Sequence, residues 1–71
     1  MSYNYRCINQ NLFDENIGNY ITYGIEITDE NIIVNDVSCN KEKAQKIVNL
    51  MNKHQISPIH IYDVIENLLS A

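Results

Sequence analysis

Hydrophobic and polar residues alternate along two stretches in the first half of the chain. Alternation with a period of two is typical of β-strands, because successive side chains of a strand point to opposite faces of the sheet. Tyr3, Tyr5 and Cys7 alternate in this way with Asn4 and Arg6. The pattern therefore predicts strands over residues 3–8 and 20–28, and a third strand is expected over residues 32–37, after a short polar turn.

The clearest alternation lies in the second stretch. Its apolar set is expected to pack into a core: Ile21, Tyr23, Ile25 and Ile27. The other set is expected to face water or a partner: Tyr20, Thr22, Gly24, Glu26 and Thr28. A glycine in mid-strand indicates a bulge or the close approach of another backbone.

The segments between the predicted strands are polar. Residues 9–18 are predicted to form a loop, from which Leu12, Phe13 and Ile17 fold back onto the edge of the core. The short turn 29–31 predicts a hairpin between the second and third strands. Residues 32–34 are all apolar, so the third strand is either buried on both faces or bulged.

The second half of the chain has helical periodicity. A first helix starts at the predicted N-cap Asn40, ends near residue 52 or 53, and carries an apolar stripe of Ala44, Ile47, Val48 and Met51, widened by Leu50. Ser57-Pro58 predicts the start of a second helix, since serine favours the cap and proline the first helical position. Its apolar stripe comprises Ile61, Val64, Ile65, Leu68 and Leu69.

This order predicts an α+β domain over residues 1–71. A three-stranded antiparallel sheet is followed by two helices packed on one face, in the order β-β-β-α-α. No predicted element is left to cover the opposite face of the sheet, which makes that face a candidate contact surface.

Length and composition narrow the possible functions. The chain has 71 residues, of which 45% are hydrophobic and 20% charged. A domain of this size buries only about 60% of its unfolded surface, which leaves little apolar material for a deep substrate pocket. There is no long apolar run and no signal peptide, so a cytoplasmic protein is expected. In that compartment Cys7 and Cys39 are expected to be free and buried.

Several strings together resemble a known family. They are Tyr-Gly-Ile at 23–25, Asp-Val-Ser at 36–38, and Ser-Pro-Ile-His at 57–60 followed by Asp-Val-Ile-Glu at 63–66. The pattern over residues 22–69 resembles an uncharacterised family of small proteins, a domain of unknown function, from low-GC Gram-positive anaerobic bacteria. The resemblance implies a fold and a bacterial cytoplasmic setting, but no activity.

Two alternative functions rest on charged and metal-binding side chains. A nucleic-acid-binding regulator would use the lysines of the first helix, Lys41, Lys43, Lys46 and Lys53, although the net charge of −4 argues against it. A metal-binding sensor or enzyme would use His60 and Asp63, which lie three residues apart, with His54 or Cys39 nearby. Without a nucleophile or phosphate-loop motif, we expect no enzymatic activity and no cofactor.

Tyrosines concentrate in the first two predicted strands and favour a protein contact. Tyr is enriched at interfaces because it combines a large apolar area with a polar end. We therefore expect a protein partner or self-association, with homodimerisation as the simplest form. The candidate interaction surface comprises Tyr3, Tyr5, Tyr20, Thr22, Gly24 and Glu26.

Overall fold

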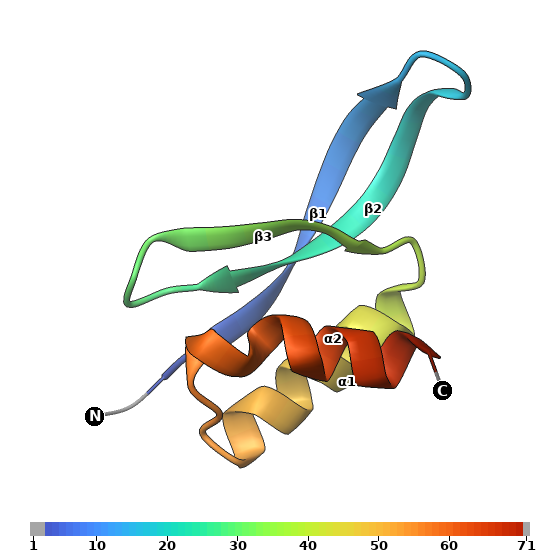
Figure 1. The fold of residues 1–71 in the computed structure, drawn as a ribbon. Coiled ribbons are helices and arrows are strands. Elements are labelled where there is room, and N and C mark those ends of the chain that lie inside the picture. The colour runs from blue at the N-terminus through green and yellow to red at the C-terminus, as the bar shows by residue number, and fades with distance from the viewer. Residues whose placement is uncertain (1–2, 71) are drawn as a thin grey trace.

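Three strands and two helices follow one another in the predicted order. The computed structural model describes residues 3–70, with elements β1 (Tyr5–Asp14), β2 (Gly18–Ile27), β3 (Ile32–Ser38), α1 (Lys41–Lys53), the 3₁₀ turn η1 (Pro58–His60) and α2 (Ile61–Ser70). The strands form one antiparallel sheet in the order β1-β2-β3 (Figure 1). The predicted α+β fold class is confirmed.

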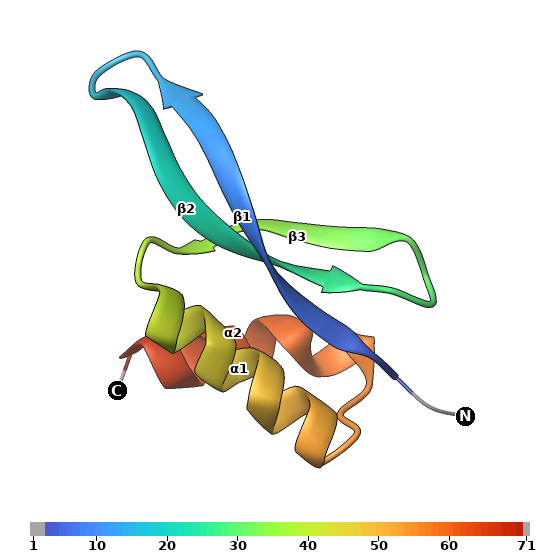
Figure 2. The ribbon, with the colours of Figure 1, turned by 180° about the vertical axis from the view of Figure 1, so that it is seen from behind.

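Both helices lie on the same side of the sheet (Figures 1 and 2). Helix α1 contacts all three strands, and α2 packs against α1. The predicted face of α1 is buried against the sheet: Ala44, Ile47, Val48 and Met51. It meets Ile25 and Ile27 of β2 in the core. Leu50 is only half-buried, because it points away from the sheet towards α2.

The ends of the helices follow from local chemistry. The Asn40 side chain accepts a hydrogen bond from the Lys43 amide at 3.2 Å, as predicted for an N-cap. After α1, Gln55 has a positive φ of 48°, and the amides of Gln55 and Ile56 donate to the carbonyls of Asn52 and Met51. This pair of bonds is the Schellman arrangement that commonly ends a helix.

The second helix starts less regularly than predicted. Pro58 opens the 3₁₀ turn η1, and the Ser57 side chain makes no capping hydrogen bond. Of the predicted stripe, Ile61 is buried and Val64, Ile65 and Leu68 pack partly against the core. The side chain of Leu69 lies outside the part of the chain that the structure describes.

The predicted loop over residues 9–18 is wrong. These residues continue β1 and turn into β2, in an unbroken register from Tyr5 opposite Ile27 to Asp14 opposite Gly18. The Asp14 carboxylate accepts from the amides of Asn16 and Ile17, and Gly18 has a φ of 81°. A three-residue loop closed by a left-handed glycine is a common hairpin connection. Only residues 15–17 form the turn, and the polar residues 9–11 belong to strand β1.

The β1–β2 hairpin projects beyond the rest of the molecule. Pairing with β3 reaches only from Ile27 to Tyr23 of β2. Residues 9–22, here called the arm, therefore form a two-stranded extension that rises away from the helices (Figures 1 and 2). The radius of gyration is 12.3 Å, whereas a compact chain of this length would have about 11 Å.

Amide side chains from the end of α1 pair with the outer edge of β1. Asn52 accepts from the Tyr5 amide at 2.9 Å and donates to the Tyr5 carbonyl at 3.0 Å. Gln55 does the same for Tyr3, at 2.9 and 3.0 Å. These two side chains imitate a neighbouring strand, so the start of β1 has satisfied backbone groups on both sides.

Two observations concern the expected cellular setting. Both cysteines are free, but Cys39 is exposed and Cys7 is only half-buried, so the expectation that both are buried is wrong. Burial raises the pKa of the Cys7 thiol, and nearby Lys41 partly opposes this effect. Within residues 3–70, each helix is too short or too polar to cross a membrane.

Candidate functional site

The six residues of the predicted interaction surface do not share one exposed face. Tyr5 is 5% exposed and belongs to the core, where its hydroxyl donates to the Ile56 carbonyl. Burial raises the pKa of this phenol. Tyr3 packs partly against the same core. The predicted exposure of Tyr5 is wrong because alternation assigns a residue to a face but does not identify the face that the helices cover.

Thr22 is also buried, although it lies on the helix-free face of the sheet. It is fully inaccessible, and its Oγ1 lies 2.8 Å from Asp36 Oδ1 and 3.0 Å from the Ser38 carbonyl oxygen. Both acceptors come from the end of β3. The prediction assigned Thr22 to the correct face, but its exposure is wrong because β3 bends over this face.

A polar network covers the middle of the helix-free face. Between Ile25 and Tyr23 of β2, the register with β3 shifts, and Asp36 adopts a φ of 53°. Its carboxylate accepts from the Tyr20 hydroxyl at 2.9 Å, and its amide donates to Gln10 Oε1 at 2.8 Å. Gln10 Nε2 also donates to Asn35 at 2.6 Å. The third strand is therefore bulged, but the bulge follows residues 32–34, of which Ile32 and Ile33 are 42% and 48% exposed, so burial of this strand on both faces is wrong. The helix-free face is not bare.

Gly24 is buried beneath this network. A Cβ atom added at Gly24 would lie 2.7 Å from the Val34 carbonyl oxygen and 2.7 Å from Gln10 Oε1. The predicted close approach of another backbone is confirmed. Gly24 therefore contributes space for β3 to cross and offers no surface to a partner.

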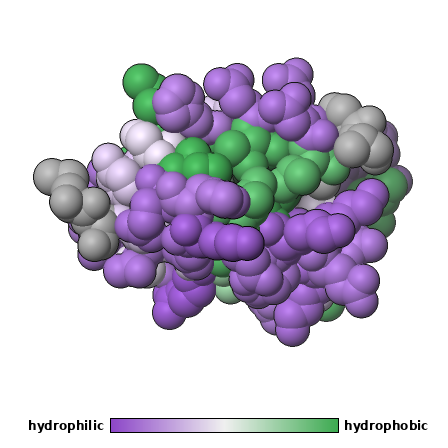
Figure 3. All heavy atoms as spheres, turned by 90° about the horizontal axis from the view of Figure 1, so that it is seen from below, coloured by the Kyte–Doolittle hydropathy of each residue, from purple (hydrophilic) through white to green (hydrophobic). Residues whose placement is uncertain are grey.

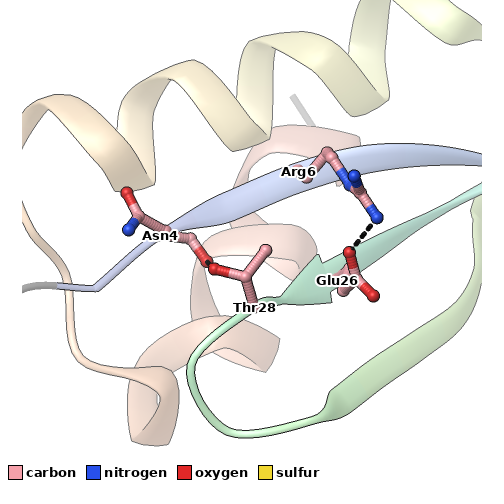
Figure 4. Close-up of polar contacts among 4 residues, drawn as sticks. All are labelled: Asn4, Arg6, Glu26 and Thr28. Atoms are coloured by element: carbon pink, nitrogen blue, oxygen red, sulfur yellow. Dashed lines mark hydrogen bonds and ion pairs between the residues drawn. The ribbon is translucent and has the colours of Figure 1, made fainter.

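Glu26 is the last of the six predicted residues. Its carboxylate pairs with the Arg6 guanidinium on the adjacent strand (Figure 4). Nearby, the Thr28 hydroxyl lies 3.4 Å from the Asn4 carbonyl oxygen, which closes the same end of the β1–β2 ladder. The Arg6 side chain is 65% exposed, so this pair contributes at most about 1 kcal/mol.

Three strongly exposed apolar side chains lie instead on the arm. Phe13 and Ile17 are each 70% exposed, and Ile21 is 64% exposed. The register places Phe13 and Ile21 on the same face as Ile25, but beyond the end of the helices. The predicted packing of Phe13, Ile17 and Ile21 is wrong for this reason. The available signal was Asp14 and Gly18 flanking a short turn, which would have identified Phe13 and Ile17 as residues at a hairpin tip.

A groove between α1 and α2 is a second feature that the sequence analysis missed. It has a volume of about 320 Å³ and is lined by Lys46, Asn49, Leu50, Lys53 and Leu68. Seen from the helix side, an apolar area lies within a largely polar face (Figure 3). The lining is almost entirely apolar, and the methylene groups of the exposed residues Lys46 and Lys53 contribute to it together with the two leucines. Positions 46, 50 and 53 share one side of α1 because they are spaced at i, i+4 and i+7.

The residues of the two alternative functions are more dispersed. His60 Nδ1 lies 4.0 Å from Asp63 Oδ2, and both side chains are exposed, at 62% and 77%. Within the described residues no group of three metal-ligating side chains occurs, whereas zinc sites normally use three or four. Of the α1 lysines named for nucleic-acid binding, Lys46 and Lys53 line the apolar groove.

Tyr20 gives the polar network a dependence on alkaline pH. Its hydrogen bond to Asp36 raises the pKa of the phenol above the ordinary value of 10.0. Because the folded chain holds this proton more tightly, the stabilisation is complete below pH 10.0 and is lost as the pH rises through the folded-state pKa.

We therefore expect the free energy of unfolding to fall above pH 10.0, and to fall less steeply in Tyr20→Phe. Urea unfolding at a series of pH values tests this, with Tyr62→Phe as the control for loss of an exposed tyrosine. Equal alkaline loss in Tyr20→Phe and the natural chain would contradict the described hydrogen bond.

Comparison with known proteins gives one match. No curated protein and no solved structure matches the chain. A family of unknown function, DUF6514, matches over residues 1–71. The match includes β1 and the arm, which lay outside the resemblance over residues 22–69. The chain therefore belongs to DUF6514, a family of unknown function.

Proposed function

We propose that the protein is a small, non-enzymatic interaction module and that the arm is its contact element. The observation that carries the proposal is the exposure of Phe13, Ile17 and Ile21, at 70%, 70% and 64%, on a two-stranded extension. Transferring apolar surface from water to a partner is favourable by about 25 cal/mol per Å². The three side chains thus provide a driving force for binding that the isolated chain does not use.

The backbone of the arm supports the same function. Residues at odd positions of β1 point their amide and carbonyl groups away from β2, as the bonds of Asn52 to Tyr5 show. Along the arm this outer edge runs past Asn9, Asn11 and Phe13, beyond the reach of the α1 amides. An open strand edge can add a strand from a partner. We therefore propose that the predicted contact through a sheet edge is made by the outer edge of the arm.

An affinity capture from cells that encode the protein tests this function. The bait is the full chain, and the arm variant is Phe13→Ser, Ile17→Asn, Ile21→Thr. The matched control is Ile59→Asn, Tyr62→Ser, which removes exposed apolar side chains, 80% and 69% exposed, from outside the arm. Circular dichroism verifies that each variant is folded.

We expect a stoichiometric partner, or further copies of the chain, to be retained by the natural chain and the control but lost from the arm variant. Equal retention by the arm variant, or equal loss from the control, would contradict the proposal. So would the absence of any bound chain at all.

A further inference from the structure

The groove and the arm have complementary chemistry. The groove is lined almost entirely by apolar atoms, from Leu50, Leu68 and the aliphatic stems of Lys46 and Lys53. Because both lysines are exposed residues, they also bring two positive charges to this part of the surface. Residues 13–17 at the end of the arm, here called the tip, read Phe-Asp-Glu-Asn-Ile. The tip thus carries two exposed apolar side chains on either side of two carboxylates.

The arrangement of these charges favours contact. One oxygen of the Asp14 carboxylate accepts from the backbone amides of the turn, and Glu15 is exposed. Complementary charges around an apolar contact steer association and fix its orientation. Two chains with a net charge of −4 repel each other, but this repulsion is screened beyond about 8 Å at physiological salt. At the contact itself the local attraction between lysine and carboxylate prevails.

We infer that the groove of one copy binds the tip of a second copy. Phe13 or Ile17 would lie against the leucines, and the carboxylates of the tip would lie near Lys46 and Lys53. This inference rests on the proposed function, because it names the partner of the arm: another copy of the same chain.

The positions of the two surfaces determine the type of assembly. The tip lies at the far end of the arm, and the groove lies on the opposite, helix side of the molecule (Figures 1 and 3). A tip-to-groove contact is therefore heterologous: a pair still has one free tip and one free groove. Assembly continues head to tail into rings or filaments unless one of the two surfaces is blocked.

The contact is small, so the association is weak. A hairpin tip in a groove of about 320 Å³ buries less than the roughly 1,200 Å² of stable interfaces. Sedimentation of the natural chain is therefore expected to give a mass that rises steadily between about 20 µM and about 1 mM, without a plateau at the dimer.

Mixing two blocked variants is the decisive experiment. The tip variant Phe13→Ser, Glu15→Lys keeps an intact groove, and the groove variant Lys46→Glu, Lys53→Glu keeps an intact tip. Each variant alone should be a monomer of about 8.2 kDa. When mixed with the natural chain, the groove variant supplies only tips and the tip variant supplies only grooves. Each variant should therefore stop the growth of assemblies and lower their mean mass.

An equimolar mixture of the two variants should form a 1:1 pair, because the intact tip of the groove variant meets the intact groove of the tip variant. In a second mixture Phe13→Ser alone blocks the tip of one chain, so that no reversed charge on this tip can attract the groove of the other chain, which carries Lys46→Glu, Lys53→Glu. The intact tip of the second chain then meets the intact groove of the first, and growth stops at a 1:1 pair. Lys41→Glu, Lys43→Glu is the matched control, with the same charge change on α1 outside the groove.

Nuclear magnetic resonance provides a readout that does not depend on large assemblies. On addition of the unlabelled groove variant, the labelled Phe13→Ser chain should shift at residues 46–53 and not at its tip. Adding Lys46→Glu, Lys53→Glu to the labelled chain should weaken binding about tenfold, because the loss of each exposed charge pair weakens it about three- to fivefold.

The outcomes separate the two proposals. A natural chain that stays monomeric at about 1 mM, a symmetric dimer unaffected by either variant, or a mixture that forms no 1:1 pair would overturn the tip-to-groove contact. If the natural chain captures a different protein and the arm variant does not, the proposed function stands although the tip-to-groove contact is refuted. If neither self-association nor capture depends on the arm, both fail.

Discussion

Ile47→Ala is expected to leave a large fraction of the protein unfolded at 25 °C. Ile47 is fully buried in α1 and packs with Ile25, Ile27 and Met51 in the core. Removing a buried isoleucine side chain to alanine costs about 2–5 kcal/mol. The core of a domain below about 80 residues rarely supplies more than about 3–5 kcal/mol of net stability. The loss is thus comparable with the whole free energy of unfolding.

Urea unfolding followed by far-ultraviolet circular dichroism measures this effect. Ile59→Ala is the matched control, because Ile59 is 80% exposed and should change stability by no more than about 0.5 kcal/mol. If Ile47→Ala unfolded at nearly the same urea concentration as the natural chain, the described core would be incorrect.

Gly24→Ala should destabilise the protein by about 1–3 kcal/mol through overpacking. Glycine in a strand normally costs about 0.5–1 kcal/mol relative to alanine, so the intrinsic preference alone would predict a gain. The new Cβ, however, would lie 2.7 Å from the Val34 carbonyl oxygen. Because that oxygen belongs to the backbone of β3, relief requires the strand to move.

The Gln10 side chain distinguishes the two possible sources of this loss. Its Oε1 would also be 2.7 Å from the new Cβ, but this side chain could rotate away and lose its bond to the Asp36 amide. In the background of Gln10→Ala, the effect of Gly24→Ala should persist, because the Val34 carbonyl remains. Full recovery in this background, measured by urea unfolding, would show that the close approach of β3 is not the cause.

The sequence allowed the elements and their order to be predicted where local chemistry specifies them. The stripe of α1 and its cap Asn40 are examples, since both depend on residues within one helix. Alternation also assigned Ile21 and Thr22 to the correct faces of β2. It could not predict their exposure, because exposure depends on how far the helices and β3 extend along the hairpin.

The functional features were harder to predict for a related reason. Phe13 and Ile17 look like core residues as long as residues 9–18 are taken for a loop, and only the hairpin register places them at the tip. The groove brings Leu68 of α2 beside Leu50 of α1, which are distant in the sequence. Periodicity within one helix contains no information about such a pairing.

The pairing of Asn52 and Gln55 with the start of β1 divides the hairpin into two halves of different stability. Tyr3 and Tyr5 are tied to the end of α1, so the lower half of β1 can separate only when that helix end also opens. Beyond Gln10 and Tyr20, whose side chains bond to β3, residues 11–19 form a two-stranded ribbon with few other contacts, which opens far more easily. This end of the arm can therefore fray and re-form while the core stays intact, which lets it adapt its shape to a bound surface at little thermodynamic cost.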